Sequence, residues 1–161
     1  DWQSQSYSIV SKNGFLGEGL FDHARTNDVL YRFESGMEVS IKSGGPGIRF
    51  VGSEAWIGNT GWRTPVESDK QEVLNRVYGA KDLRLKVYAG EHRNFVNAIR
   101  NRGDTMYSAE HYHRISTWLI CGNLAAQLDR KLYWDPQKEA FENDDEANAL
   151  RSKPARKSWA L

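Results

Sequence analysis

The sequence is short of cysteine and of long apolar runs. Cys121 is the only cysteine among 161 residues, so no internal disulfide can form, and its apolar neighbours predict a buried, unreactive thiol. The densest apolar stretch, residues 117–126, has about half the length of a membrane-spanning helix, which argues against a membrane span. We therefore expect a soluble domain from a reducing compartment. The cytoplasm is the favoured location, and export of a longer parent protein is the alternative.

An excess of charge of one sign is also missing. The chain has 22 Lys and Arg residues and 21 Asp and Glu residues, which gives a net charge of +1 at pH 7. Both signs are scattered along the chain. Nucleic acids and anionic membranes select clustered positive charge, so neither is expected as a partner. At 161 residues the chain has the size of one domain, and we expect a single domain over residues 1–161.

Strand-like alternation dominates the first half of the chain. Residues 28–33 and 37–41 alternate apolar and polar side chains, and residues 34–36 suit a hairpin turn between them. Two shorter strands are expected at residues 48–51 and 55–58. Such alternation is typical of an antiparallel sheet with one covered face.

A helical period replaces this alternation from Glu91 onward. The first helix is expected to end at Gly103, and a second should run from about Ala109 to about Leu128. The second is apolar nearly all round its middle turns, which indicates burial on more than one side. Asp144 can cap a last helix over residues 145–151. Together these patterns predict an α+β fold, a mainly antiparallel open sheet with helices packed on one face.

The glycines and histidines do not form a recognisable cofactor or metal motif. Gly14, Gly17 and Gly19 have the wrong order for a dinucleotide fingerprint, and the glycines from Gly44 onward lead into a strand rather than a helix. Glu110, His111 and His113 stand one and two residues apart on a helix, so they cannot converge on one metal ion from that helix alone. We expect this chain to bind neither a nucleotide cofactor nor a metal.

One polar pair does stand at a place suited to binding. His113 and Arg114 open the buried helix, where an imidazole and a guanidinium can face a cleft and donate hydrogen bonds to hydroxyl or carbonyl oxygens. A purely structural role is the alternative, because nothing in the sequence fixes a partner for either. Six tryptophans raise the question of carbohydrate stacking, but they are spread over the chain, and packing is the default use of such rings.

The chain resembles the carboxy-terminal domain of the Gfo/Idh/MocA oxidoreductase family, bacterial type. Two runs carry the resemblance most strongly, EHRNFVNAIRNRGD and SAEHYHRISTWLICGNLAAQLDRKLYWDPQKEAFENDDEANAL. Upstream, GLFDHARTNDVLYRFESGMEV and GGPGIRFVGSEAWIG are similar to strand segments of the same family. The resemblance implies a substrate domain of the dihydrodipicolinate-reductase-like type, part of a longer enzyme.

The resemblance implies that this longer enzyme has an amino-terminal Rossmann domain that holds NAD or NADP. It also implies that the enzyme moves a hydride between the nicotinamide and a sugar, cyclitol or related polyol. The family's glycine-rich, Glu-Lys-Pro and Asp-x-x-x-His motifs are not found in this chain. No catalytic residue is therefore assigned here, and the fragment alone is expected to be inactive. Glu110, His113 and Arg114 fall where one wall of the substrate cleft is expected. Two alternatives stay open, a non-catalytic carbohydrate-binding or assembly module and an NAD-dependent glycoside hydrolase of the same family.

A homodimer is expected through the sheet face opposite the helices. If Phe95, Ile99 and Leu119 cover one face of the sheet, large groups are left on the other face, and exposed apolar patches usually mark association. Two identical sheets meeting about a two-fold axis would bury both copies at once. The resemblance points the same way, since members of the family commonly pair through this sheet.

Overall fold

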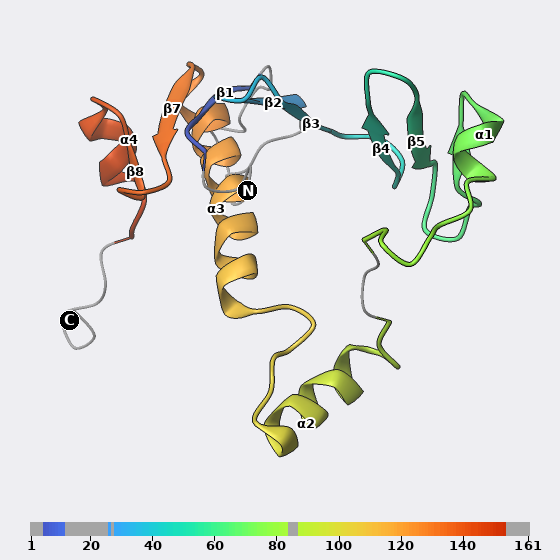
Figure 1. Ribbon diagram of the computed structural model, residues 1–161. Helices are drawn as coiled ribbons and strands as arrows, with labels where there is room; N and C mark the ends of the chain where they lie inside the picture. Colours follow the sequence, from blue (N-terminus) through green and yellow to red (C-terminus); the bar gives the residue numbers. More distant parts are fainter. Residues whose placement is uncertain (1–4, 12–25, 27, 84–86, 154–161) are drawn as a thin grey trace. The chain divides into compact units, whose positions relative to one another are not determined.

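The computed structural model describes residues 5–11, 26, 28–83 and 87–153. It shows two compact units, one made of Asp1–Ser43 and Tyr107–Leu161 and the other of Gly44–Met106 (Figure 1). The first unit therefore combines an early and a late segment of the sequence. The second is a continuous insertion between them.

A five-stranded antiparallel sheet forms the first unit. Its strands follow the order β3-β2-β1-β7-β8. The predicted hairpin joins β2 to β3, where Gly36 takes a left-handed φ of 84° and Phe33 N–H donates to the Met37 carbonyl at 2.9 Å. The strands are β1 (Tyr7–Ser11), β2 (Asp28–Phe33), β3 (Glu38–Lys42), β7 (Leu132–Asp135) and β8 (Ala140–Phe141).

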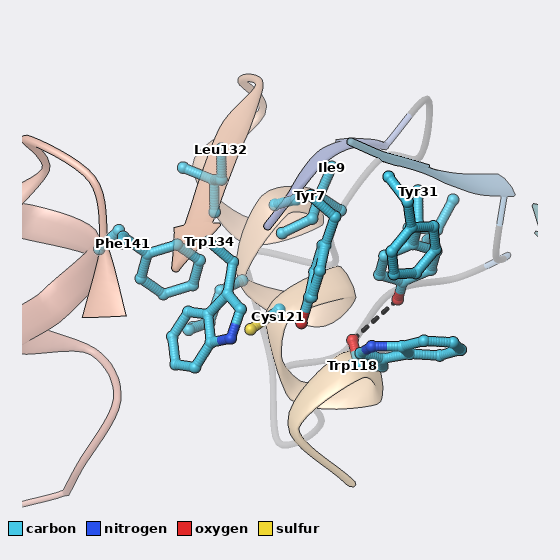
Figure 2. Close-up of a cluster of buried hydrophobic side chains, with 13 residues drawn as sticks. Tyr7, Ile9, Tyr31, Trp118, Cys121, Leu132, Trp134 and Phe141 are labelled. Atoms are coloured by element: carbon cyan, nitrogen blue, oxygen red, sulfur yellow. Dashed lines mark hydrogen bonds between the residues drawn. The ribbon is translucent and has the colours of Figure 1, made fainter. Parts of the chain in front are cut away.

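Helix α3 (Ala109–Leu128) covers one face of this sheet, with the bounds that the sequence predicts. Strand alternation turns Val29, Tyr31 and Phe33 of β2 toward the helix. The Tyr31 hydroxyl donates to the Trp118 carbonyl at 2.8 Å (Figure 2). Cys121 is only 2 % exposed, which confirms its predicted burial. The antiparallel sheet with a covering helix confirms the predicted α+β class.

The side chains expected to cover the sheet are not the ones that do so. The covering residues come from α3 and include Trp118, Cys121 and Ala125, which lie three and four residues apart on one helical face. Leu119 lies outside that face and is 56 % exposed. Phe95 and Ile99 belong to the second unit and are not part of this core cluster.

The chain closes the first unit with a short helix, α4 (Asp145–Ala149), after β8. Its cap is Asp144, as predicted, whose carboxylate accepts from Ala147 N–H at 3.0 Å. The Asn148 side chain ties α4 to β8 by bonding both the N–H and the carbonyl of Phe141, at 2.9 and 2.8 Å. The helix ends at Ala149 rather than at the predicted Arg151.

A three-stranded antiparallel sheet, β4-β5-β6, and two helices form the second unit. The strand predicted at residues 55–58 begins one residue later, because the Ala55 carbonyl accepts from Gly52 N–H in the turn before it. Likewise α2 ends before Gly103, since Arg102 already takes the left-handed conformation with φ of 51°. The elements are β4 (Ile48–Val51), β5 (Trp56–Asn59), β6 (Glu67–Ser68), α1 (Gln71–Leu74) and α2 (Glu91–Asn101). Across the described residues, no helix has the length and apolar character to span a membrane.

Candidate functional site

A pocket of about 100 Å³ lies in the first unit, between the opening turns of α3 and the turn that joins β7 to β8. It contains all three side chains that the sequence analysis proposed for a substrate cleft. Its lining mixes charged, polar and aromatic groups. The lining residues are Tyr7, Glu110, His113, Arg114, Thr117, Trp118, Trp134, Pro136, Gln137 and Glu139.

Ser108 fixes where α3 begins and therefore where these side chains emerge. Its hydroxyl accepts from His111 N–H at 3.2 Å, the usual bond of an N-cap serine. The same hydroxyl lies 2.8 Å from His111 Nδ1, so the His111 ring is held at the cap. His111 is not among the pocket-lining residues, and the cap leaves His113 and Arg114 to line the pocket.

Arg114 is paired with Glu110 one helical turn earlier. Arg114 Nε donates to Glu110 Oε1 at 2.8 Å, and this hydrogen bond is the main cause of a lowered pKa for the Glu110 carboxyl. The Glu110 side chain is 66 % exposed and that of Arg114 33 %, so water screens the pair and its contribution to stability is small. Glu110 is thus an ionised acceptor, and Arg114 is a donor held in place beside it.

Glu139 is the charged pocket residue that the sequence analysis missed. Its Oε1 lies 2.6 Å from His113 Nε2, across 26 positions of sequence. The two side chains are 54 % (His113) and 58 % (Glu139) exposed, so the contact sits in reach of solvent and of a ligand. A carboxylate at this distance orients the imidazole.

The turn between β7 and β8 places Glu139. Asp135 Oδ1 accepts from the N–H groups of Gln137 and Lys138 at 2.9 and 3.1 Å, and Lys138 Nζ lies 2.7 Å from Asp135 Oδ2. The hydrogen bond from Lys138 is the main cause of a lowered pKa for Asp135. Glu139 takes a left-handed φ of 48°, and Arg151 donates to its carbonyl. Asp135 and Pro136 are typical turn residues, but the contact of this turn with α3 joins residues too distant in sequence to be predicted from the pattern.

Three aromatic residues of the buried core cluster also belong to the pocket lining, and Figure 2 shows them within that cluster. Trp118 comes from α3, Trp134 from β7 and Tyr7 from β1. Tyr7 is only 4 % exposed, and apart from the Cys121 thiol beside it, its hydroxyl has no hydrogen-bond partner among the described residues. Burial, followed by the neighbouring Cys121, raises the pKa of Tyr7 far above its usual value, so the hydroxyl stays protonated.

This arrangement offers hydrogen-bond donors and acceptors to a small polar molecule. Glu110 and Glu139 accept hydrogen bonds, Arg114 donates them, and His113 can do either. The Trp118 and Trp134 side chains border these polar groups, but they are only 9 % and 5 % exposed, so they offer little apolar surface. The pocket lining can therefore exchange hydrogen bonds with hydroxyl groups.

Neither a metal nor a nicotinamide cofactor fits the described residues. No three His, Cys, Asp or Glu side chains come close enough together there to hold a metal ion. A dinucleotide site needs a glycine-rich turn from a strand into a helix, so that helical N–H groups meet the pyrophosphate. In the described chain, α1 and α4 follow strands without any glycine between, while α2 and α3 follow irregular segments.

Comparison with known proteins gives one family match. The model described as the oxidoreductase family, C-terminal alpha/beta domain, matches residues 79–161, just over half of the chain. The matched range includes α2, α3 and the β7–β8 turn, and so nearly all of the pocket lining. No curated protein and no solved structure matches the chain significantly.

Proposed function

The chain belongs to the Gfo/Idh/MocA oxidoreductase family as its C-terminal alpha/beta domain, and on that premise we propose that it supplies one wall of a substrate site. The substrate class is a sugar, cyclitol or related polyol. NAD or NADP would be bound by a separate nucleotide-binding domain and would carry the hydride. The role of this domain is to bind and orient the substrate.

The convergence of separate elements on one pocket carries the proposal. Glu110, His113 and Arg114 come from α3, while Glu139 comes from a turn 26 positions beyond His113. A neutral hydroxyl can donate to either carboxylate and accept from Arg114. Such a mixture of a few placed polar groups and aromatic walls is common in small-molecule sites.

We also propose that the parent protein is a homodimer that pairs through the outer face of the five-stranded sheet. The outward residues Val10 and Leu30 are partly exposed, and Tyr133 is 49 % exposed, so this face offers some apolar area. Closed two-fold dimers are the commonest soluble assembly. The contact would leave the pocket on the helix side of the sheet accessible.

Steady-state kinetics of the full-length protein test the substrate role. Sugars and cyclitols are screened with NAD and NADP, and turnover is then compared for His113→Ala, Arg114→Ala and the matched control His92→Ala, an exposed histidine on α2. Loss of one substrate hydrogen bond is expected to lower kcat/KM by roughly tenfold in the two pocket variants and to leave the control unchanged. Unchanged kinetics in both pocket variants would reduce His113 and Arg114 to structural residues.

The same screen separates the alternatives. Hydrolysis of a glycoside without net reduction of the nicotinamide would identify the glycoside hydrolase. Sugar binding with no turnover under any cofactor condition would instead identify a binding module.

A further inference from the structure

The titratable groups that line the pocket in the first unit are balanced in pairs. Glu110, His113 and Arg114 come from α3, and Glu139 comes from the β7–β8 turn. Arg114 Nε lies 2.8 Å from Glu110 Oε1, and His113 Nε2 lies 2.6 Å from Glu139 Oε1. In the described lining, each basic side chain therefore already has a carboxylate as its partner.

Two further basic side chains near the β7–β8 turn are bound elsewhere. Lys138 Nζ lies 2.7 Å from Asp135 Oδ2. Arg151 donates to the backbone carbonyls of Glu139 and Asn148. Neither Lys138 nor Arg151 belongs to the pocket lining. Within the described lining, an anionic ligand group would therefore meet two carboxylates and no basic side chain without a partner.

The two carboxylates remain accessible to a ligand. The side chains of Glu110 and Glu139 are each more than half exposed. The hydrogen bond from Arg114 holds the pKa of the Glu110 carboxyl below its ordinary value, so Glu110 is ionised at neutral pH. An ionised carboxylate accepts hydrogen bonds and donates none. A ligand hydroxyl can donate to it, whereas a ligand carboxylate or doubly ionised phosphate has no proton to donate and is repelled.

We propose that this wall selects uncharged hydroxyl groups of the substrate over phosphate and carboxylate groups, with Glu110 and Glu139 as the specificity-determining residues. This selectivity rests on the proposed function, to which it adds the charge of the substrate. Glu110 acts in two ways, because its charge attracts a hydroxyl proton and also offsets the charge of Arg114. Glu139 supplies the second carboxylate from a different element. Repulsion of the wrong group is a source of specificity beside attraction of the right one.

Matched neutral and anionic compounds test this selectivity in the full-length protein. The neutral parent compound is the sugar or cyclitol that the protein uses or binds best in the substrate screen. It is compared with its monophosphates, each phosphorylated on a different hydroxyl, so that the set includes the compound whose charge lies against this wall. Each monophosphate is measured as a competitive inhibitor and therefore needs no turnover.

Glu110→Gln and Glu139→Gln keep the size of the side chain and remove its charge. We expect each variant to lower the inhibition constant of at least one monophosphate about fivefold relative to the dissociation constant of the neutral parent, because a like charge beside the phosphate is gone. The matched control is Glu34→Gln, which removes an exposed carboxylate of the same unit outside the pocket lining. It should change neither constant.

The outcomes separate charge selection from the proposed function. If His113→Ala or Arg114→Ala lowers kcat/KM while both glutamine variants leave every ratio unchanged, the substrate role stands and charge selection is overturned. A monophosphate that binds the wild type more tightly than the neutral parent, and binds both glutamine variants more weakly than the wild type, also overturns charge selection. Unchanged constants in all four pocket variants overturn both, as does a screen in which no sugar or cyclitol binds.

Discussion

Cys121 and Tyr7 show how burial controls single side chains in this domain. Both lie between α3 and the sheet, and burial raises the pKa of the Cys121 thiol to about 12, while the hydrogen bond from Tyr7 acts in the opposite direction. The reactive form of cysteine is the thiolate. Cys121 is therefore protonated and inert near neutral pH.

Thiol labelling at pH 8 should show this directly. With a pKa of about 12, native Cys121 should react at least about a hundredfold more slowly than in denaturant, where an ordinary thiol pKa of about 8.5 returns. The native reaction is measured on protein whose far-UV circular dichroism shows it folded. Equal rates in native and denatured protein would contradict the placement of Cys121 under the sheet.

Asp144 combines a helix cap with an ion pair. Its carboxylate accepts from Ala147 N–H at 3.0 Å and from Arg130 Nη2 at 2.9 Å, and the bond to Arg130 is the main cause of a pKa lowered to about 2. Asp144→Ala should lower the free energy of unfolding by about 1–2 kcal/mol. Asp144→Asn keeps the cap acceptor but loses the charge, so it should lower the free energy of unfolding by less than Asp144→Ala does.

The pH dependence of this contribution follows from the direction of the shift. The folded pKa lies below the unfolded value, so the stabilisation is complete above pH 4 to 5 and is lost as the pH falls toward 2. Chemical denaturation at pH 7 and pH 3 should therefore show a smaller difference between wild type and Asp144→Asn at the lower pH. A difference independent of pH would show that the ion pair contributes nothing.

At the scale of elements, the sequence predicted those helices and strands whose position depends on residues close together in the chain. The β2–β3 hairpin and the bounds of α3 follow from alternation, a turn glycine at Gly36 and the helical period. The errors at Ala55 and Arg102 arose where a single turn hydrogen bond or a left-handed residue sets the end of an element. The contact between Glu139 and His113 could not be predicted, because the sheet brings together a turn and a helix that are distant in sequence.

The close contact of α3 with β2 gives a test of the packing. A Cβ at Gly122 would overlap the Tyr31 hydroxyl, which is held by the Trp118 carbonyl. Gly122→Ala gains about 1 kcal/mol of helix propensity, but overpacking a rigid core costs about 1–3 kcal/mol. We expect a net loss of stability in thermal unfolding.

A second variant identifies the cause of that loss. Tyr31→Phe removes the overlapping oxygen, so Gly122→Ala should be less destabilising in that background than in wild type. If Gly122→Ala raised the melting temperature of the wild type, α3 would not lie this close to β2.

At the scale of the molecule, the sequence predicted the fold class and the family but not the character of the outer sheet face. The expectation of a largely apolar face rested on Phe95, Ile99 and Leu119 as the covering layer. With α3 covering the sheet through Trp118 and Cys121 instead, the outward positions of β2 and β3 include Arg32 and Glu38, which are ion-paired.

Hydrogen–deuterium exchange of the full-length protein, with cofactor and with or without its substrate, tests the central claim most directly. If the pocket is one wall of the substrate site, substrate should slow exchange at residues 109–117, at the start of α3, and at residues 135–140, around the β7–β8 turn. Exchange in β3, which belongs to the same unit but supplies no residue to the pocket lining, should stay unchanged as an internal control. Slowed exchange elsewhere in the protein, with none in these two segments, would contradict the assignment of the pocket to substrate binding.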